Sequence, residues 1–377
     1  MNIPEATLTN YLISSGNSQQ THYRGVMEMS QAKVDHINRE EEELEKIEEN
    51  TIYKKISDNP EAFYQFKGFS IQNFEILFGL VEEAISQTQR GRKPRFTPLD
   101  QFLLFLHYLR IYPWMEAMKV VFNLELTTFK SLISKNLSFI APILEGEFIR
   151  KRIFESLDID SPEDFPECKF IVDATVQKII KPYTEFDEAS KFFSGKHYKY
   201  CLKSQVIINL KGLAVDIVTS IPGSHHDKSI FDNNIEIFLR DFSESFTILA
   251  DKGYKDRASK ILLTPVKGNC SQLTPDQLWK NEKISKIRML IENYLGRLKA
   301  KFSIMEQQYR GSHEQYKDIF TTCCALVNFD IMFGNPLREE DYKYFSRFRA
   351  IVRREVMEEK KNISKKAKSK TKKNIKI

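Results

Sequence analysis

The pattern of hydrophobic and polar positions changes near residue 165. Before that point, apolar residues recur every three or four positions, which predicts amphipathic helices. The first runs from an N-cap at Ser70 to about residue 87, and others cover about residues 97–113, 115–122 and 127–140. The second of these begins with Thr97-Pro98, where threonine can cap the helix and proline suits its first position.

The helices on either side of Asn123 have the arrangement of a helix-turn-helix. Asparagine tolerates the left-handed backbone that such a turn requires. The helix from Thr127 would then be the recognition helix, with Lys130 and Lys135 on a polar face that can contact DNA. The alternative is a three-helix unit that only packs against the rest of the protein, because the positive charge of this segment is moderate.

After residue 165 the pattern becomes strand-like. Runs rich in β-branched and aromatic residues predict strands at about residues 169–177, 198–210, 213–218, 245–250 and 261–265. A helix is expected between the third and fourth strands, and a long helix from about residue 281 to 301 follows the fifth. This order predicts an α/β domain of ribonuclease H-like type, in which helices flank a central mixed sheet, preceded by an all-helical helix-turn-helix domain.

Four regions follow from these patterns. Residues 1–60 are a polar, acidic arm that is expected to be partly disordered, and residues 61–150 are the helical domain. Residues 165–336 are the α/β domain, and residues 337–377 are a basic tail. The net charge of +6 comes from this tail, because residues 353–377 alone contain 11 Lys and Arg against 3 Glu. Such a tail can be a nuclear-import signal, a non-specific DNA arm or a solvated segment with neither role.

Three acidic residues of the α/β region are candidates for a common site. Asp173 interrupts an apolar strand, where an unpaired carboxylate is costly, Asp251 directly follows a strand, and Glu292 lies on the long helix. In a ribonuclease H-like sheet the first and fourth strands are neighbours, so the two aspartates converge and the helix can present the glutamate. Three such oxygen ligands suit Mg²⁺ or Mn²⁺.

Each acid also has an ordinary structural explanation. Asp251 can be a turn residue after a strand, and Glu292 can form a surface pair with Arg288 one helical turn away. Asp173 is the hardest to explain in this way. The adjacent His225 and His226 are more typical of a helix start, with Asp227 or Ser224 as the N-cap, than of a metal site. The residues alone therefore leave both a metal site and unrelated surface acids open.

Short motifs occur in order between residues 172 and 299. They are VDAT at 172–175, SGKH at 194–197, PGS at 222–224, ADKGY at 250–254, TPVK at 264–267 and RMLIENYLGRLK at 288–299. This arrangement resembles the DDE superfamily of endonucleases and transposases of the PIF/Harbinger type, with relatives among bacterial insertion-sequence transposases. Residues 97–140 also resemble the helix-turn-helix that precedes the nuclease in that family.

The resemblance implies roles for individual residues. Asp173, Asp251 and Glu292 would be the catalytic acids, and they would bind two divalent metal ions, Mg²⁺ or Mn²⁺, in one active site. The residues expected to contact DNA in this region are Lys196, His197, Lys203, Arg288 and Lys299.

The last two of these match the Arg and Lys of a Tyr-Arg-Glu-Lys signature in related transposases. The Tyr position of that signature is Ser285 here, so the role of that tyrosine is not carried over.

The sequence thus predicts a transposase or endonuclease that cleaves DNA at transposon ends and can join strands, by metal-dependent hydrolysis and transesterification. Its expected partners are double-stranded DNA with terminal inverted repeats, further copies of the same chain on that DNA, and a separate Myb-like DNA-binding protein. Two alternatives remain. One is a host-adapted, catalytically idle DNA-binding protein derived from a transposase, and the other is a scaffold for a protein partner.

The sequence predicts neither a membrane protein nor a secreted one. No apolar run approaches the roughly 18 residues that a membrane span needs. The N-terminus lacks the features of a signal peptide, and none of the five cysteines forms a CxxC pair. A nuclear location is expected in a eukaryote because of the basic tail, and a cytoplasmic one otherwise.

Overall fold

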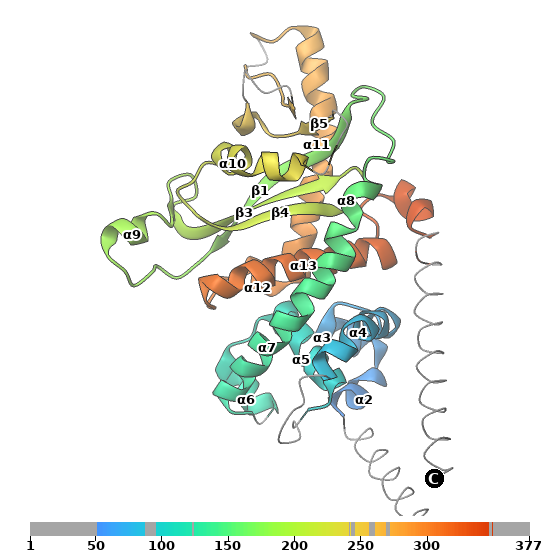
Figure 1. Ribbon diagram of the computed structural model, residues 1–377, viewed down its shortest axis with the longest axis vertical. Coiled ribbons are helices and arrows are strands. Elements are labelled where there is room, and N and C mark those ends of the chain that lie inside the picture. The colour runs from blue at the N-terminus through green and yellow to red at the C-terminus, as the bar shows by residue number, and fades with distance from the viewer. Residues whose placement is uncertain are drawn as a thin grey trace, which may run out of the picture. The chain divides into compact units, whose positions relative to one another are not determined.

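The computed structural model of the chain describes residues 51–86, 96–122, 124–240, 242, 246–255, 261–268, 272–346 and 349 (Figure 1). The chain divides into two compact units with a boundary after Asp58. The described part of the first unit holds one short helix, α2 (Ile52–Ser57), which is capped by the side chain of Thr51. All other described elements belong to the second unit, which begins at Asn59.

The second unit opens with helices, as the spacing of apolar residues predicts. They are α3 (Pro60–Lys67), α4 (Ile71–Ser86), α5 (Pro98–Ile111), α6 (Met115–Phe122), α7 (Leu126–Glu145), the π-helical turn η1 (Gly146–Arg150) and α8 (Arg152–Glu155). The predicted caps are confirmed, because the hydroxyls of Ser70 and Thr97 accept hydrogen bonds from the N–H groups of Asn73 and Asp100. Helix α7 runs five residues beyond its predicted end.

A mixed sheet follows the helices. The elements are β1 (Cys168–Lys178), α9 (Phe186–Ser190), β2 (Phe193–Ser194), β3 (Lys199–Asn209), β4 (Ala214–Pro222), α10 (Asp227–Leu239), β5 (Thr247–Leu249), η2 (Lys252–Tyr254) and β6 (Leu262–Leu263). Strand β1 pairs antiparallel with β3, which in turn pairs antiparallel with β4 and with the short β2. On its other side β1 pairs parallel with β5, and β5 with β6. The first and fourth strands predicted from the sequence correspond to β1 and β5, and they lie side by side as expected.

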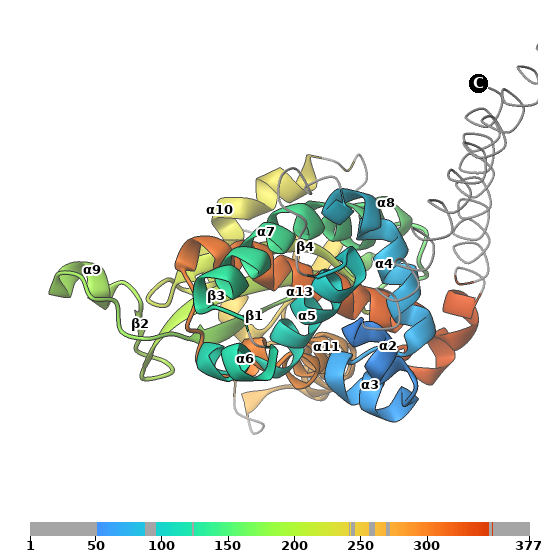
Figure 2. The same ribbon diagram turned by 90° about the horizontal axis from the view of Figure 1, so that it is seen from below.

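Helices cover both faces of this sheet (Figures 1 and 2). The remaining elements are α11 (Pro275–Lys301), α12 (Ser303–Glu306), α13 (His313–Phe333) and the short η4 (Glu339–Asp341). Helix α10 covers one face, where Phe170 and Val172 of β1 meet Phe231 and Phe238 in an aromatic-rich core. Helices α11 and α13 cover the opposite face. Since side chains alternate along a strand, Asp173 must face the side of α11 and α13. The predicted α/β class, a mixed sheet flanked by helices, is confirmed.

The helical region packs directly on the sheet region within this unit. Helix α7 lies against α13, which packs on β4. The buried amide of Asn328 on α13 joins the two parts, because it donates hydrogen bonds to the carbonyls of Phe148 and Ala214, each at 2.7 Å. The helices therefore do pack against the rest of the protein, as the alternative to a DNA-binding helix-turn-helix requires. The boundaries of separate domains and a DNA-binding role of the helices stay predictions.

The folded body continues past residue 336, where the sequence places the start of the tail. The carboxylate of Asp341 is fully buried and accepts from Lys211 at 2.6 Å and from Arg338 at 2.8 Å. Phe345 is also buried. Residues 337–346 thus hold buried side chains, and one of their ion pairs reaches Lys211, far away in the sequence. The boundary of the basic tail stays a prediction. Three other predicted features lie outside the described residues: residues 1–50 of the polar arm 1–60, the turn residue Asn123 and the basic run 353–377.

Among the described residues, no helix is both long and apolar enough to cross a membrane.

Candidate active site

The two candidate aspartates are aligned by the pairing of β1 with β5. In this parallel pair, Ile171 lies opposite Leu249. Asp173 and Asp251 each stand two residues further along their chains, so both emerge at the same level of the sheet. Asp251 follows the end of β5 and precedes the turn η2, without capping it by its side chain. Neighbouring parallel strands thus place two carboxylates together, although 78 residues separate them in the sequence.

Asp173 is the less exposed of the two, with 23% of its side chain accessible against 44% for Asp251. Burial raises the pKa of Asp173 above that of an ordinary aspartate, because a charged carboxylate loses hydration there. A hydrogen bond from the N–H of Ala174 at 2.8 Å and the nearby guanidinium of Arg288 oppose this rise in the pKa. The cost of placing an acid in an apolar strand is therefore partly offset by local partners.

Helix α11 supplies the third carboxylate, that of Glu292. The helix begins with a capping box between Thr274 and Gln277, six residues before the predicted start. Buried side chains on its inner face hold it against the rest of the unit; these are Ile284, Leu290, Ile291, Tyr294 and Leu298. Glu292 comes directly after the buried Ile291 and lies at the border of this inner face, with 56% of its side chain exposed.

Arg288 joins the three acids. One of its terminal nitrogens lies 3.2 Å from Asp251, and the other lies 3.7 Å from Asp173 and 3.3 Å from Glu292. Only 16% of the Arg288 side chain is exposed. The surface pair expected between Arg288 and Glu292 does form, but it belongs to a cluster of four charged groups. The structure therefore places all three candidate acids around a single guanidinium.

The carboxylates suit a hard divalent cation in ligand chemistry. They supply oxygen ligands from three separate elements, and they already converge on a positive charge. Among the described residues, no group of three His, Cys, Asp or Glu side chains lies close enough together to hold a metal ion. Arg288 stands between them, so a metal could take this place only after the guanidinium moves away. The Nε of Arg288 is buried without a hydrogen-bond partner, so this arrangement does not satisfy the arginine completely.

Comparison with known proteins covers the part of the chain that holds this cluster. Residues 172–328 match the family model of the DDE superfamily endonucleases. The matched DDE region contains Asp173, Asp251 and Glu292. The chain is also 26% identical over 279 residues to a protein of Microchaete diplosiphon described as a probable transposase for insertion sequence element IS702. That similarity covers 71% of this chain and 94% of the relative. No solved structure matches the chain significantly.

Both similarities support the resemblance to DDE transposases that the motifs indicate. Neither identifies the PIF/Harbinger type, which stays a prediction.

Lys203 is a predicted DNA contact whose ammonium the structure places among protein partners, and its role toward DNA stays a prediction. The residue lies on β3 inside the DDE region and is almost completely buried. Its ammonium donates to the carbonyl of His225 at 2.7 Å and to the carboxylate of Asp227 at 2.8 Å. This buried, paired ammonium ties β3 to the loop before α10.

Asp227 also differs from its predicted role. The N-cap of α10 is His226, and its side chain makes no capping hydrogen bond. Asp227 is the first helical residue instead, and its carboxylate pairs with Lys203 and lies 3.8 Å from Lys196. A neighbouring hydrogen bond runs from Gln205 of β3 to the buried hydroxyl of Tyr254. The sequence signal for this network is the alternation of Lys203 and Gln205, which places two polar side chains on one face of β3.

The hairpin turn between β2 and β3 remains a candidate DNA contact. Lys196 and His197 are exposed there, and Lys196 lines an open cavity of about 800 Å³. The same cavity reaches Gly253, two residues after Asp251. Partial loss of hydration, followed by the charges of the neighbouring lysines, lowers the pKa of His197.

The remaining predicted DNA contacts lie on two helices. Lys130 and Lys135 are exposed on α7, on the face away from its buried residues. Lys299 is half-buried on α11, two turns after Glu292, and forms no ion pair with any described residue. These positions are compatible with contacts to DNA phosphates, and their roles stay predictions.

Proposed function

We propose that this protein is a DDE-type transposase or endonuclease that cleaves DNA strands with the help of a divalent metal. The observation that carries the proposal is the convergence of Asp173, Asp251 and Glu292 on one guanidinium. Acids from a mid-strand position, a strand end and a helix thus supply oxygen ligands from three elements to one positive charge, as a metal site requires. The similarity of residues 172–328 to DDE endonucleases supports the same proposal.

The chemistry follows from the residues of the cluster. Divalent metal ions held by the three carboxylates would activate water or a 3′ hydroxyl and stabilise the leaving oxygen. Asp173 and Asp251 hold fixed positions because paired strands carry them, whereas Glu292 lies on the exposed edge of a helix. Arg288 limits the repulsion of the three acids while no metal is bound. Once released, it would be free to contact the phosphate backbone.

Three matched substitutions test this function. Asp173→Asn, Asp251→Asn and Glu292→Gln each preserve the shape of the side chain and remove its charge. Each is expected to reduce Mg²⁺-dependent cleavage of labelled duplex DNA by at least about a thousandfold, while DNA binding in a chelator is unchanged. Asp276→Asn, on the first turn of α11, is the matched control and leaves cleavage unchanged.

Two outcomes would contradict the proposal. Full cleavage by any of the three variants would remove that residue from the site. DNA binding by the unmodified protein without any metal-dependent cleavage would favour the catalytically idle DNA-binding protein instead.

The finer features are part of the proposal. The natural substrate would be duplex DNA with terminal inverted repeats, and strand joining would follow cleavage. A Harbinger-type protein would act with further copies of the chain and with a Myb-like partner. In a eukaryote it would work in the nucleus. Cleavage of DNA with and without inverted repeats, followed by sequencing of the product ends, tests the substrate.

A further inference from the structure

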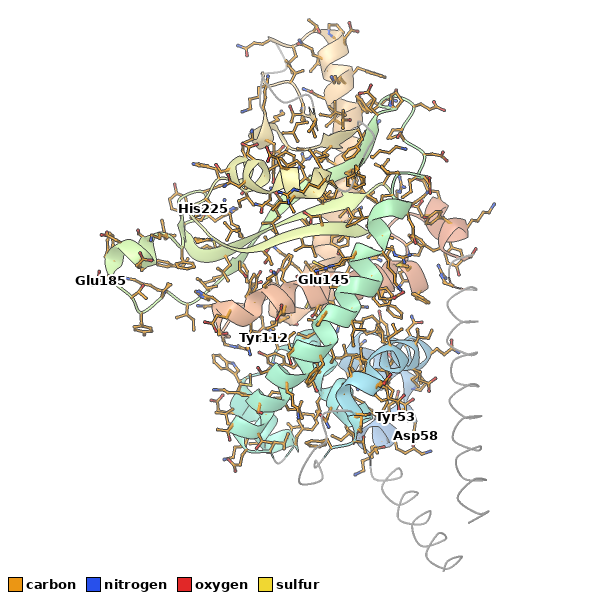
Figure 3. All side chains as sticks on the ribbon, viewed as in Figure 1. Tyr53, Asp58, Tyr112, Glu145, Glu185 and His225 are labelled. Atoms are coloured by element: carbon orange, nitrogen blue, oxygen red, sulfur yellow. The ribbon has the colours of Figure 1, made fainter. Side chains whose placement is uncertain are left out.

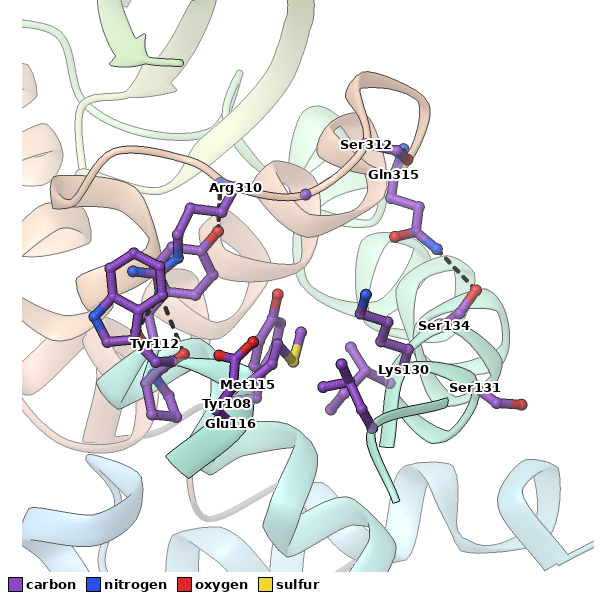
Figure 4. Close-up of a pocket in the computed structure, with 15 residues that line it drawn as sticks. Tyr108, Tyr112, Met115, Glu116, Lys130, Ser131, Ser134, Arg310, Ser312 and Gln315 are labelled. Atoms are coloured by element: carbon purple, nitrogen blue, oxygen red, sulfur yellow. Dashed lines mark hydrogen bonds between the residues drawn. The ribbon is translucent and has the colours of Figure 1, made fainter. Parts of the chain in front are cut away.

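A second cavity lies away from the carboxylate cluster, among α5, α6, α7 and the segment that precedes α13 (Figure 4). Its volume is about 620 Å³, within the range of pockets that bind small ligands. Aromatic and cationic side chains dominate one part of its wall, and hydroxyl and amide groups the other. The lining residues that matter here are Tyr112, Trp114, Lys130, Ser134, Arg310 and Gln315.

The aromatic part of the wall is held rigidly. The guanidinium of Arg310 lies 4.0 Å from the ring centre of Tyr112 and 4.4 Å from that of Trp114. It also donates hydrogen bonds to the carbonyls of Tyr112 and Pro113, at 2.6 and 3.1 Å. Tyr112 itself has a left-handed backbone (φ 49°), which residues other than glycine rarely adopt. Strained positions of this kind cluster at binding sites.

Trp114 is held in place but not covered. Its residue surface is 66% exposed, although tryptophan usually buries most of its area. Arg310 packs on the ring and leaves the remaining surface open. A fixed and open indole is a suitable platform for another flat ring, because stacked aromatic rings attract each other.

Polar groups line the opposite part of the cavity. Figure 4 shows the side chain of Lys130 directed into the cavity from α7. Behind it, Gln315 donates a hydrogen bond to Ser134 at 2.8 Å, which ties α13 to α7. Lys130 forms no ion pair with the residues that the structure describes. The charged residues that line the cavity are Lys130, Arg310 and Glu116. Two cations against one acid favour an anionic ligand.

We propose that this cavity binds an unpaired nucleotide of a DNA strand, with the base stacked on Trp114 and a phosphate held by Lys130. The inference rests on the proposed function, because it requires that the protein holds DNA. Lys130 and Lys135 are exposed on α7, and Lys130 also lines the cavity, so DNA held by this helix would lie beside it.

A nucleotide that is already unpaired is favoured over one extracted from an intact duplex. Extraction breaks stacking and pairing within the DNA, and stacking on a single aromatic ring does not exceed that cost. The expected ligand is therefore an overhang or a nicked end, as is present when a strand has been cut.

The chain offers a matched pair of residues for a test. Its two tryptophans are Trp114 and Trp279, and Trp279 is 50% exposed on α11, outside this cavity. Binding would be measured in a chelator, so that no cleavage occurs, with three DNA probes of one sequence. These are a blunt duplex, the same duplex with single-stranded overhangs of four nucleotides, and the overhang duplex with abasic overhang positions.

Trp114→Ala is expected to weaken binding of the overhang duplex by about 5- to 100-fold and to leave the blunt and abasic probes unchanged. Trp279→Ala should alter none of the three. In a Trp279→Phe background, where Trp114 is the remaining tryptophan, the overhang duplex should quench fluorescence more than the abasic probe does. Lys130→Gln should weaken overhang binding and lower its salt dependence.

Equal binding of the three probes, or an unchanged affinity of Trp114→Ala for the overhang duplex, would overturn the inference while leaving the proposed nuclease function intact. Absence of binding to any DNA would overturn both. Far-ultraviolet circular dichroism melts show whether each variant is folded, and a loss of overhang binding by Trp114→Ala with an unchanged melt supports the stacking role. Fluorescence quenching of Trp114 in the otherwise intact cavity gives a second reading that does not depend on the alanine variant.

Discussion

The guanidinium of Arg288 lies 3.2 Å from the carboxylate of Asp251. This pair links a helix to the end of a strand, and the same guanidinium is within 3.7 Å of Asp173. Because a guanidinium carries one positive charge and three carboxylates carry three negative charges, the cluster has a net negative charge whenever all four groups are ionised. It therefore attracts a further cation while Arg288 competes for the same oxygens.

Removal of this competing charge is expected to strengthen metal binding. Arg288→Gln should raise the affinity for Mn²⁺ at least about tenfold. The positive charge of Arg288 repels a cation that binds the same carboxylates, and at a separation of about 4 Å this repulsion amounts to several kcal/mol before solvent screens it. Isothermal titration calorimetry without DNA measures this. Arg288→Lys keeps the charge and is the control, with an affinity close to that of the unmodified protein. An unchanged or lower affinity of Arg288→Gln would show that the arginine does not compete with the metal.

Two lysines within residues 172–328 should differ in their effects. Lys196→Gln is expected to weaken duplex DNA binding and to reduce the slope of log K against log salt by about 1, without a change in melting temperature, because its ammonium is exposed. Lys203→Gln should instead destabilise the fold by about 3 kcal/mol, since it leaves the carboxylate of Asp227 without its buried partner. Filter binding at several salt concentrations and urea unfolding measure the two effects. A reversal would support Lys203 as a DNA contact.

Lys67 is expected to reduce the stability of the helical region at neutral pH. Its ammonium is buried near the rings of Phe63 and Phe66 without a hydrogen-bond partner, and burial lowers its pKa to about 6. Between about pH 6 and 10.5 the folded chain therefore binds fewer protons at this residue than the unfolded chain does. The contribution of Lys67 to folding stability rises with pH across that range.

Lys67→Met should raise the melting temperature at pH 7 by at least about 2 °C. The gain should be largest below about pH 6, where the lysine is charged in both states, and should shrink toward pH 10. Lys55→Met, at an exposed position, is the control. A gain that does not vary with pH would show that better apolar packing of the methionine, and not removal of the buried charge, governs the effect.

Asp341 should be essential for the packing of residues 337–346 on the body. Asp341→Asn removes the buried charge that pairs with Lys211 and Arg338, and it should lower the free energy of unfolding by about 3 kcal/mol. Chemical unfolding monitored by fluorescence measures the loss. Glu340→Gln, which affects an exposed pair with the same arginine, should cost less than about 1 kcal/mol. Equal effects of both substitutions would mean that the segment is not held by the buried pair.

The local pattern of the sequence predicts most elements of the fold. The helices that begin at Thr97 and Ser70 start where their caps indicate, because capping depends on residues three positions apart. Strand β1 is evident from its β-branched and aromatic residues, and Asp173 stands out because an apolar strand rarely contains an acid. The end of α7 is less evident, because the helix continues past its predicted end where Ala141 and Leu144 are buried. The start of α11 does have a local signal, the capping box of Thr274 and Gln277, which lies six residues before the predicted start.

The sequence by itself determined which residues could form a site. The two aspartates, the glutamate and Arg288 are recognisable from residue type, element and motif order. Only the tertiary structure decided how they meet, because the pairing of β1 with β5 aligns the aspartates and the packing of α11 turns Arg288 toward all three acids. It likewise decided that Lys203 is buried beneath Asp227. Charge and periodicity are local properties of the chain, whereas the burial and partners of a side chain depend on segments distant in sequence.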